Sequence, residues 1–208
     1  MPLNLQIAEA PKDGVCTLEE AIQFFRIPDL VTPDERNLID LCVQAATGAA
    51  ERYTRRALRP QTWRLYLPCF PRCRSFELPF PPLKSVEKIQ YVKEDGTTTA
   101  DIDESVYDVN AFREPGQVAL RSFQSWPVDL NPNFSVSNIF VEFVCGYDAT
   151  NKIPAELKLA TMQLAKHFYD SRDPVVVGPG GIQAVIVPIN FQWMFDFWRV
   201  LDFHEYVV

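Results

Sequence analysis

The chain has 208 residues and a formal net charge of −7; 47% of its residues are hydrophobic and 23% are charged. This balance excludes a disordered or low-complexity protein, because the chain can bury one substantial core. No apolar run reaches the roughly 18 residues of a membrane span, and the first residues lack the layout of a signal peptide, so we expect a protein that is made in the cytoplasm and stays there.

The cysteines and prolines also indicate a folded cytoplasmic protein. Five cysteines are an odd number, and they are scattered along the chain, which favours reduced thiols over a disulfide framework. The 17 prolines against 8 glycines indicate sheet edges and stiff connections.

The first part of the chain predicts two capped helices. Thr17 and Glu20 have the spacing of a capping box, and this helix should end before Pro28. Thr32 followed by Pro33 predicts the start of a second helix, with an N-cap and a proline at the first helical position. Its apolar residues recur at helical steps, and we expect them to face a core: Leu38, Leu41, Cys42, Ala45, Ala49 and Tyr53. Their small size, with Gly48 among them, predicts close approach of another helix.

After Pro60 the apolar period changes to two, which predicts strands. The expected strands cover residues 62–67, 86–92, 107–110, 117–121 and 138–144. A hairpin turn is expected over residues 94–97, where Asp95 precedes Gly96. Proline clusters separate these strands, so residues 61–147 read as a small antiparallel β unit.

Helical periodicity returns at Pro154, with an apolar stripe through Leu157, Ala160, Leu164, Ala165 and Phe168. The glycine-rich segment 178–181 reads as a flexible joint. The last 18 residues carry seven aromatic residues: Phe191, Trp193, Phe195, Phe197, Trp198, Phe203 and Tyr206. As a helix, this tail would be hydrophobic nearly all round and must be buried, either on its own core or on another chain. The sequence leaves both options open.

These elements predict an α+β fold: a helical bundle with an inserted small antiparallel β unit and an extended aromatic C-terminal tail. We expect an N-terminal extension over residues 1–16 and a bundle from 17–60 and 153–172. The β unit covers 61–150, and 173–208 form a linker and a partner-binding tail.

Residues that could carry out catalysis are sparse. His167 and His204 stand alone, and Cys69 and Cys73 have three residues between them and no second pair to complete a zinc site. The segment 178–181 lacks the Lys-Ser/Thr of a phosphate-binding loop. We therefore expect no enzyme, no metal and no cofactor. An enzyme with an unrecognised site remains an alternative.

Charge is segregated along the chain. Residues 52–74 contain seven arginines and no acid, whereas residues 94–114 contain seven acids and one arginine. The arginines could contact an acidic protein surface, bind nucleic acid or remain solvated. We expect the two stretches to meet across neighbouring copies of the chain, through these residues: Arg52, Arg55, Arg56, Arg59, Asp101, Asp103 and Glu104.

The order of several motifs resembles that of tailed-phage head–tail connector proteins, also called adaptor or head completion proteins. The helix-to-strand junction, residues 51–58 followed by Gln61-Thr62-Trp63, is similar to theirs. The proline-rich crossing at residues 78–86, Trp126-Pro127, residues 144–147 and Ile153-Pro154 match later landmarks. The likeness covers roughly residues 17–172.

The resemblance implies a dodecameric ring that sits under the portal protein, extends the DNA channel and joins head to tail. It implies that the C-terminal tail, with its seven aromatic residues, engages the portal. The other expected partners are a head-closure or tail protein and DNA that passes without sequence-specific binding, with no membrane. Such a protein would assemble in the host cytoplasm and end in the neck of the virion. A DNA-packaging accessory protein that binds DNA through its arginines is the alternative.

Overall fold

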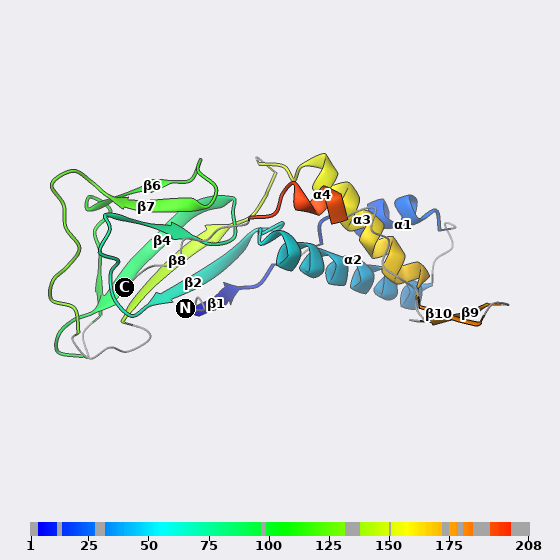
Figure 1. Ribbon diagram of the computed structural model, residues 1–208, viewed down its shortest axis with the longest axis horizontal. Coiled ribbons are helices and arrows are strands. Elements are labelled where there is room, and N and C mark those ends of the chain that lie inside the picture. The colour runs from blue at the N-terminus through cyan, green and yellow to red at the C-terminus, as the bar shows by residue number, and fades with distance from the viewer. Residues whose placement is uncertain are drawn as a thin grey trace. The chain divides into compact units, whose positions relative to one another are not determined.

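The computed structural model describes residues 4–11, 14–27, 32–96, 99–131, 138–149, 151–171, 175–178, 181–184 and 192–200. They divide into two compact units. The β unit comes mainly from residues 4–11 and 60–147, and the helical unit from 14–59 and 148–199 (Figure 1). Helices and antiparallel sheets are both present, so the predicted α+β class is confirmed.

The larger sheet of the β unit has five antiparallel strands. Their order is β1 (Asn4–Glu9), β2 (Gln61–Leu67), β8 (Ile139–Cys145), β4 (Leu83–Val92) and β5 (Thr99–Asp101). Along β8 every second side chain is buried, from Ile139 to Cys145, because successive side chains point to opposite faces of a sheet. One face of this sheet therefore belongs to the core.

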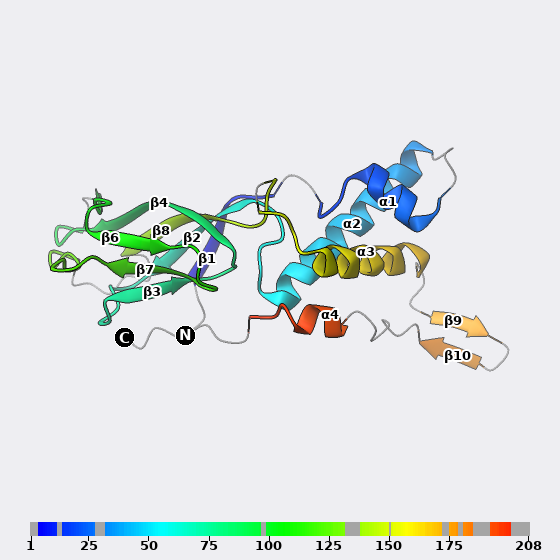
Figure 2. The same ribbon diagram turned by 90° about the horizontal axis from the view of Figure 1, so that it is seen from above.

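A second sheet supplies the other half of that core. It consists of β3 (Ser75–Leu78), β7 (Gly116–Leu120) and β6 (Tyr107–Asn110). A Cβ atom added at Gly116 would lie 2.5 Å from the Leu83 side chain, so β7 packs directly on β4. Phe76 and Val118 are almost fully buried. The two sheets thus pack face to face (Figure 2).

All five predicted strands are confirmed within three residues at either end. The short strand β3 was not predicted. Strand β1 was not predicted either: residues 4–9, which we expected in an N-terminal extension, pair antiparallel with β2.

The helical unit begins with the two predicted helices, α1 (Leu18–Phe25) and α2 (Pro33–Thr54). Both caps are confirmed. The Thr17 hydroxyl accepts a hydrogen bond from the Glu20 amide, and the Glu20 carboxylate accepts one from the Thr17 amide. The Thr32 hydroxyl accepts from the Glu35 amide. Helix α3 (Ala155–Asp170) follows Pro154 as predicted, and four residues of its expected stripe, Leu157, Ala160, Leu164 and Ala165, are buried. Phe168, at the end of the stripe, is only half-buried.

The predicted buried face of α2 is wrong. Leu41, which we expected in the core, is 62% exposed, and Ala45 is exposed as well. The buried residues of this helix are Ile39, Cys42, Val43, Ala46, Thr47, Ala50 and Thr54. The buried face is therefore rotated by about one residue. Gly48 has no atom of another element near its Cβ position, so it is not a point of close helix approach.

Two threonines belong to the buried face of α2. The Thr47 hydroxyl donates to the Val43 carbonyl at 2.7 Å, and the Thr54 hydroxyl donates to the Ala50 carbonyl at 2.7 Å. A hydroxyl that is satisfied within its own helix can be buried at little cost. The apolar pattern fits both faces, because the apolar residues of the buried face also recur at helical steps: Ile39, Cys42, Val43, Ala46 and Ala50.

The segment after α3 also differs from expectation. Strands β9 (Val175–Gly178) and β10 (Gly181–Ala184) pair antiparallel, with Gly178 opposite Gly181. Residues 179–180, in the middle of the expected joint, lie outside the described residues. Helix α4 covers only Gln192–Asp196, a small part of the tail. Phe191, Phe203 and Tyr206 lie outside the described residues.

Candidate functional site

The arginines of residues 52–74 do not form one exposed group. Arg52 and Arg55 are exposed at the end of α2, where Arg55 adopts a left-handed conformation as the C-cap. Arg59 lies 3.7 Å from the Glu51 carboxylate, and Arg64 pairs with Glu142 on the neighbouring strand. Since several of these arginines already have acidic partners within their own unit, the exposed charge is smaller than the sequence suggests.

Arg56, which we expected at a subunit interface, is instead buried in its own chain, with 7% of its surface exposed. Its Nε donates to the Trp198 carbonyl at 2.6 Å, and its guanidinium lies 5.5 Å from the Trp198 ring centroid. Burial of an arginine is tolerated only where it finds such partners.

The described part of the aromatic tail folds back onto the helical unit. Phe195 is 4% exposed, and its ring lies 6.0 Å from that of Tyr53 on α2. The sequence left open whether the tail packs on its own chain, and for Phe195 it does. Trp193 and Phe197 remain 55% and 81% exposed, and their rings lie 6.1 Å apart, edge to face.

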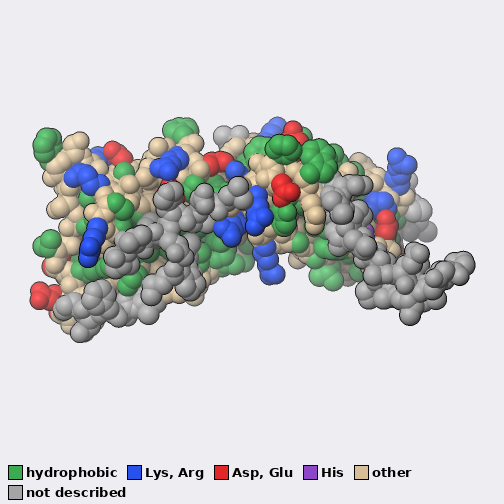
Figure 3. Space-filling view, in the orientation of Figure 1, with side chains coloured by type: hydrophobic (Ala, Val, Ile, Leu, Met, Phe, Trp, Pro, Cys, Tyr) green, Lys and Arg blue, Asp and Glu red, His purple; other side chains and the backbone are tan. Residues whose placement is uncertain are grey.

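The two exposed aromatic residues border an open hollow in the helical unit. Its lining consists of Trp193, Met194, Phe197 and Trp198 with Glu156 of α3. In the space-filling view, hydrophobic side chains lie on the surface of this unit near α4 and α3 (Figure 3). An exposed aromatic group of this kind typically marks a protein contact.

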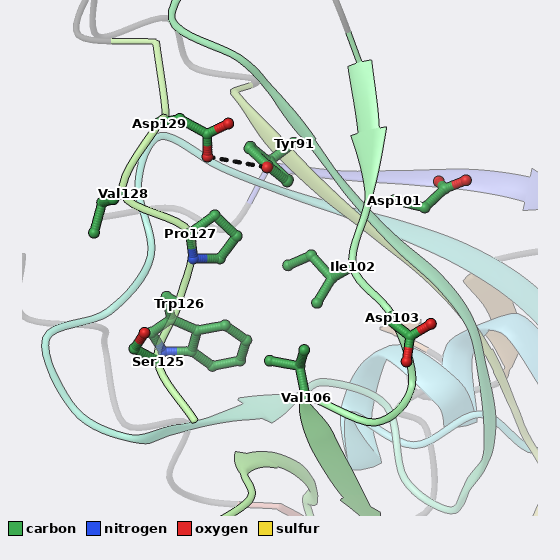
Figure 4. A pocket seen from close by; sticks show the side chains of 10 residues that line it. All are labelled: Tyr91, Asp101, Ile102, Asp103, Val106, Ser125, Trp126, Pro127, Val128 and Asp129. Atoms are coloured by element: carbon green, nitrogen blue, oxygen red, sulfur yellow. Dashed lines mark hydrogen bonds between the residues drawn. The ribbon is translucent and has the colours of Figure 1, made fainter. Parts of the chain in front are cut away.

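Asp101 and Asp103, the acids expected at the interface, line a hollow of about 360 Å³ in the β unit. Its walls include Ile102 and Trp126, whose side chains point toward each other (Figure 4). The Ser105 hydroxyl and amide hold the pKa of Asp103 below its usual value, so this carboxylate stays charged. Glu104, the third acid, is exposed beside them.

Exposed apolar loop residues were missed by the sequence reasoning. Phe112, between β6 and β7, is fully exposed, and so is Phe123, which follows β7 and has a φ of 65°. The left-handed backbone conformation of a phenylalanine costs on the order of 1–2 kcal/mol. Since the Phe123 side chain is fully exposed, no burial in the core offsets this cost. The sequence signal that could have identified each of these residues was a single aromatic residue within a polar turn.

The described residues hold no group of three or more His, Cys, Asp or Glu side chains that could bind a metal. Burial raises the pKa of the Cys16 thiol to about 11, so Cys16 stays protonated and is a poor nucleophile. In the described part of the chain no helix is long and apolar enough to cross a membrane.

Chains in three solved structures share this fold. One belongs to the neck of an empty gene transfer agent (GTA) particle computed with C6 symmetry, with a TM-score of 0.73, 18% identity and 96% of both chains covered. A second comes from the virion of a native GTA particle, with a TM-score of 0.75, 19% identity and coverage of 95% of this chain and 96% of that one. A third comes from the neck of a native GTA particle computed with C12 symmetry, with a TM-score of 0.63, 19% identity and 97% of both chains covered.

No family model matches the sequence, and no curated protein does. At 18–19% identity the structural matches establish a shared fold, since they span nearly the whole of each chain. The chain therefore shares its fold with chains of gene transfer agent necks.

Proposed function

We propose that this chain is a structural neck subunit of a phage-like particle, which forms a ring under the portal and joins head to tail. The observation that carries the proposal is the fold match over 96% of the chain to a chain of a GTA neck. Because function does not follow from fold alone, the role needs a direct test. The symmetries applied to the related necks, C6 and C12, support a ring of twelve copies.

In this proposal the subunits meet head to tail, so two different surfaces of each chain come together. The exposed arginines Arg52 and Arg55 provide one surface, and the acidic hollow with Asp101, Asp103 and Glu104 provides the other. Exposed ion pairs contribute only about 0–1 kcal/mol each, so they set the register of the ring and do not drive its assembly. Arg56 and Arg59 take no direct part, because they contact groups of their own unit.

The tail is the proposed contact with the portal, made through the exposed pair Trp193 and Phe197 and the residues beyond them. The role is structural and not catalytic, with assembly in the cytoplasm and a final place in the particle neck. A net charge of −7 suits a channel through which DNA must slide without being held.

The test is co-sedimentation of the chain with the portal protein of the same particle. We expect the wild-type chain to bind and the double variant Trp193→Ala/Phe197→Ala to bind at least roughly tenfold more weakly, as is usual for aromatic residues at the centre of an interface. The control is Phe112→Ala, which removes an even more exposed aromatic residue from the β unit. Failure of the wild-type chain to bind any portal would remove the proposal.

A DNA-packaging accessory protein remains the second candidate. The internal partners of Arg56, Arg59 and Arg64 weaken it, because these side chains have little left to offer to phosphates. Measurement of DNA affinity at several salt concentrations tests this candidate. A steep decrease in affinity with rising salt supports it, and no measurable binding excludes it.

A further inference from the structure

The contacts of helix α4 explain why it forms at all. A helix of five residues is too short to be stable alone in water, because the cost of its first turn is not recovered. Phe195 is the one residue of α4 that is buried, between this helix and α2. Helix α4 also contacts α3. Apolar packing of one ring does not set the rotation of the helix, and directional contacts restrict it.

Tyr53 of α2 provides one such contact. Its hydroxyl donates a hydrogen bond of 2.6 Å to the Asp196 carboxylate, at the last position of α4. The Arg199 guanidinium lies 5.4 Å from the Tyr53 ring centroid, so the ring is engaged from both the helix and the segment behind it. The hydrogen bond to Asp196 raises the pKa of Tyr53, which keeps the hydroxyl protonated as the donor.

Arg56 provides the second contact, directly after the C-cap residue Arg55 of α2. Its Nε donates a hydrogen bond to the Trp198 carbonyl. Carbonyls at the C-terminal end of a helix have no hydrogen-bond donor within the helix itself. The guanidinium also lies over the Trp198 ring. Hydrogen bonds from charged donors are directional and stronger than neutral ones.

The contacts leave a different part of α4 open. Trp193 and Phe197 are one helical turn apart and largely exposed, whereas Phe195 faces α2. Fixing Asp196 and Trp198 therefore also fixes the direction in which the exposed pair points.

We propose that Tyr53 and Arg56 form a clamp that holds α4 against the end of α2 and orients Trp193 and Phe197 outward. Both are positioning residues: they act on the partner-binding face through α4 and do not touch the partner. This inference rests on the proposed function only for the use of that face. The clamp itself is a property of the single chain.

The test is hydrogen exchange of residues 192–199 in the full-length chain. In Arg56→Ala we expect their amides to exchange roughly tenfold faster or more, with unchanged protection in α2 and α3. Arg56→Lys keeps the positive charge but not the Nε geometry. Its exchange rate at residues 192–199 should therefore lie between those of the wild type and Arg56→Ala. The matched control is Arg36→Ala, which removes an exposed arginine from the first turn of α2 and should change nothing.

Unchanged exchange of residues 192–199 in Arg56→Ala would overturn the clamp, and so would equal acceleration throughout α2 and α3, since that marks a general core residue. If Arg56→Ala does not fold, Tyr53→Phe replaces it. This variant removes only the hydroxyl of a partly exposed side chain, and faster exchange at residues 192–199 is again expected.

Portal binding separates the two proposals. If Arg56→Ala loosens α4 and weakens portal binding while Arg36→Ala does neither, the clamp serves the partner face. If Trp193→Ala/Phe197→Ala leaves portal binding intact, the partner face is wrong, whereas the exchange result still decides the clamp.

Discussion

At the scale of single residues, Glu20 connects two helices and completes a cap. Its carboxylate accepts from the Thr17 amide at 3.1 Å and from Lys158 of α3 at 2.9 Å. The hydrogen bond from Lys158 is the main cause that lowers the pKa of Glu20. The charged form of this residue is therefore favoured by folding.

This lowered pKa predicts an acid-sensitive contribution to stability. Because the folded pKa of Glu20 lies below the unfolded value of about 4.3, its contribution is complete above that pH and is lost as pH falls through the folded pKa. We expect the melting temperature of Glu20→Gln to decrease less than that of the wild type between pH 5 and pH 3. Glu19→Gln, at an exposed position of the same turn, is the control. Parallel curves for wild type and Glu20→Gln would contradict the role of Glu20.

Two glycines give opposite predictions at the same scale. Gly116→Ala places a Cβ 2.5 Å from the Leu83 side chain and should destabilise the β unit by about 1–3 kcal/mol. Gly48→Ala meets no atom within 4 Å inside a helix and should stabilise the chain by about 0.5–1 kcal/mol. Urea unfolding measures both. An equal effect of the two substitutions would be incompatible with the face-to-face packing of β4 and β7.

At the scale of elements, the orientation of α2 can be tested by a pair of substitutions. Ile39 is fully buried and Leu41 is 62% exposed. Ile39→Ala should cost about 2–5 kcal/mol of unfolding free energy, whereas Leu41→Ala should change it by less than about 0.5 kcal/mol. Leu41→Asp should be similarly mild, contrary to the face that the apolar pattern predicted. A larger loss in Leu41→Ala than in Ile39→Ala would restore the original assignment.

Elements with strong local signals could be predicted from the sequence. The capping residues Thr17 and Thr32 fix the starts of α1 and α2, and alternation in residues 138–144 predicts β8. These signals involve residues within one or two helical turns or along one strand. They can therefore be recognised in the sequence without knowledge of tertiary contacts.

Other elements depend on distant partners and were missed. Strand β1 has only a short alternation of the apolar residues Leu5 and Ile7 with polar ones, and it is mostly exposed. It forms because β2 offers an edge for pairing. The position of α4 depends on Tyr53 and Arg56, more than 140 residues earlier in the chain. In the sequence Arg56 belongs to a run of arginines and looks exposed, and only its contact with Trp198 distinguishes it.

At the scale of the whole molecule, the proposed ring predicts a dependence on charge. Arg52→Glu/Arg55→Glu reverses the two exposed arginines of α2 and should weaken assembly, most strongly at low salt, because screening removes such effects at high salt. Combining it with Asp101→Arg/Asp103→Arg should restore assembly. Mass photometry at low and high salt measures the fraction in rings. Assembly that is the same for all variants at every salt concentration would return these residues to the solvated surface.

We propose that copies of this chain form the ring beneath a portal. Electron microscopy of the purified chain, mixed with the portal protein of the same particle, tests this ring. We expect a ring of twelve copies, coaxial with the portal and attached to one of its ends. Bare portals beside single copies of the chain, at protein concentrations well above the dissociation constant of a specific complex, would contradict the proposed ring.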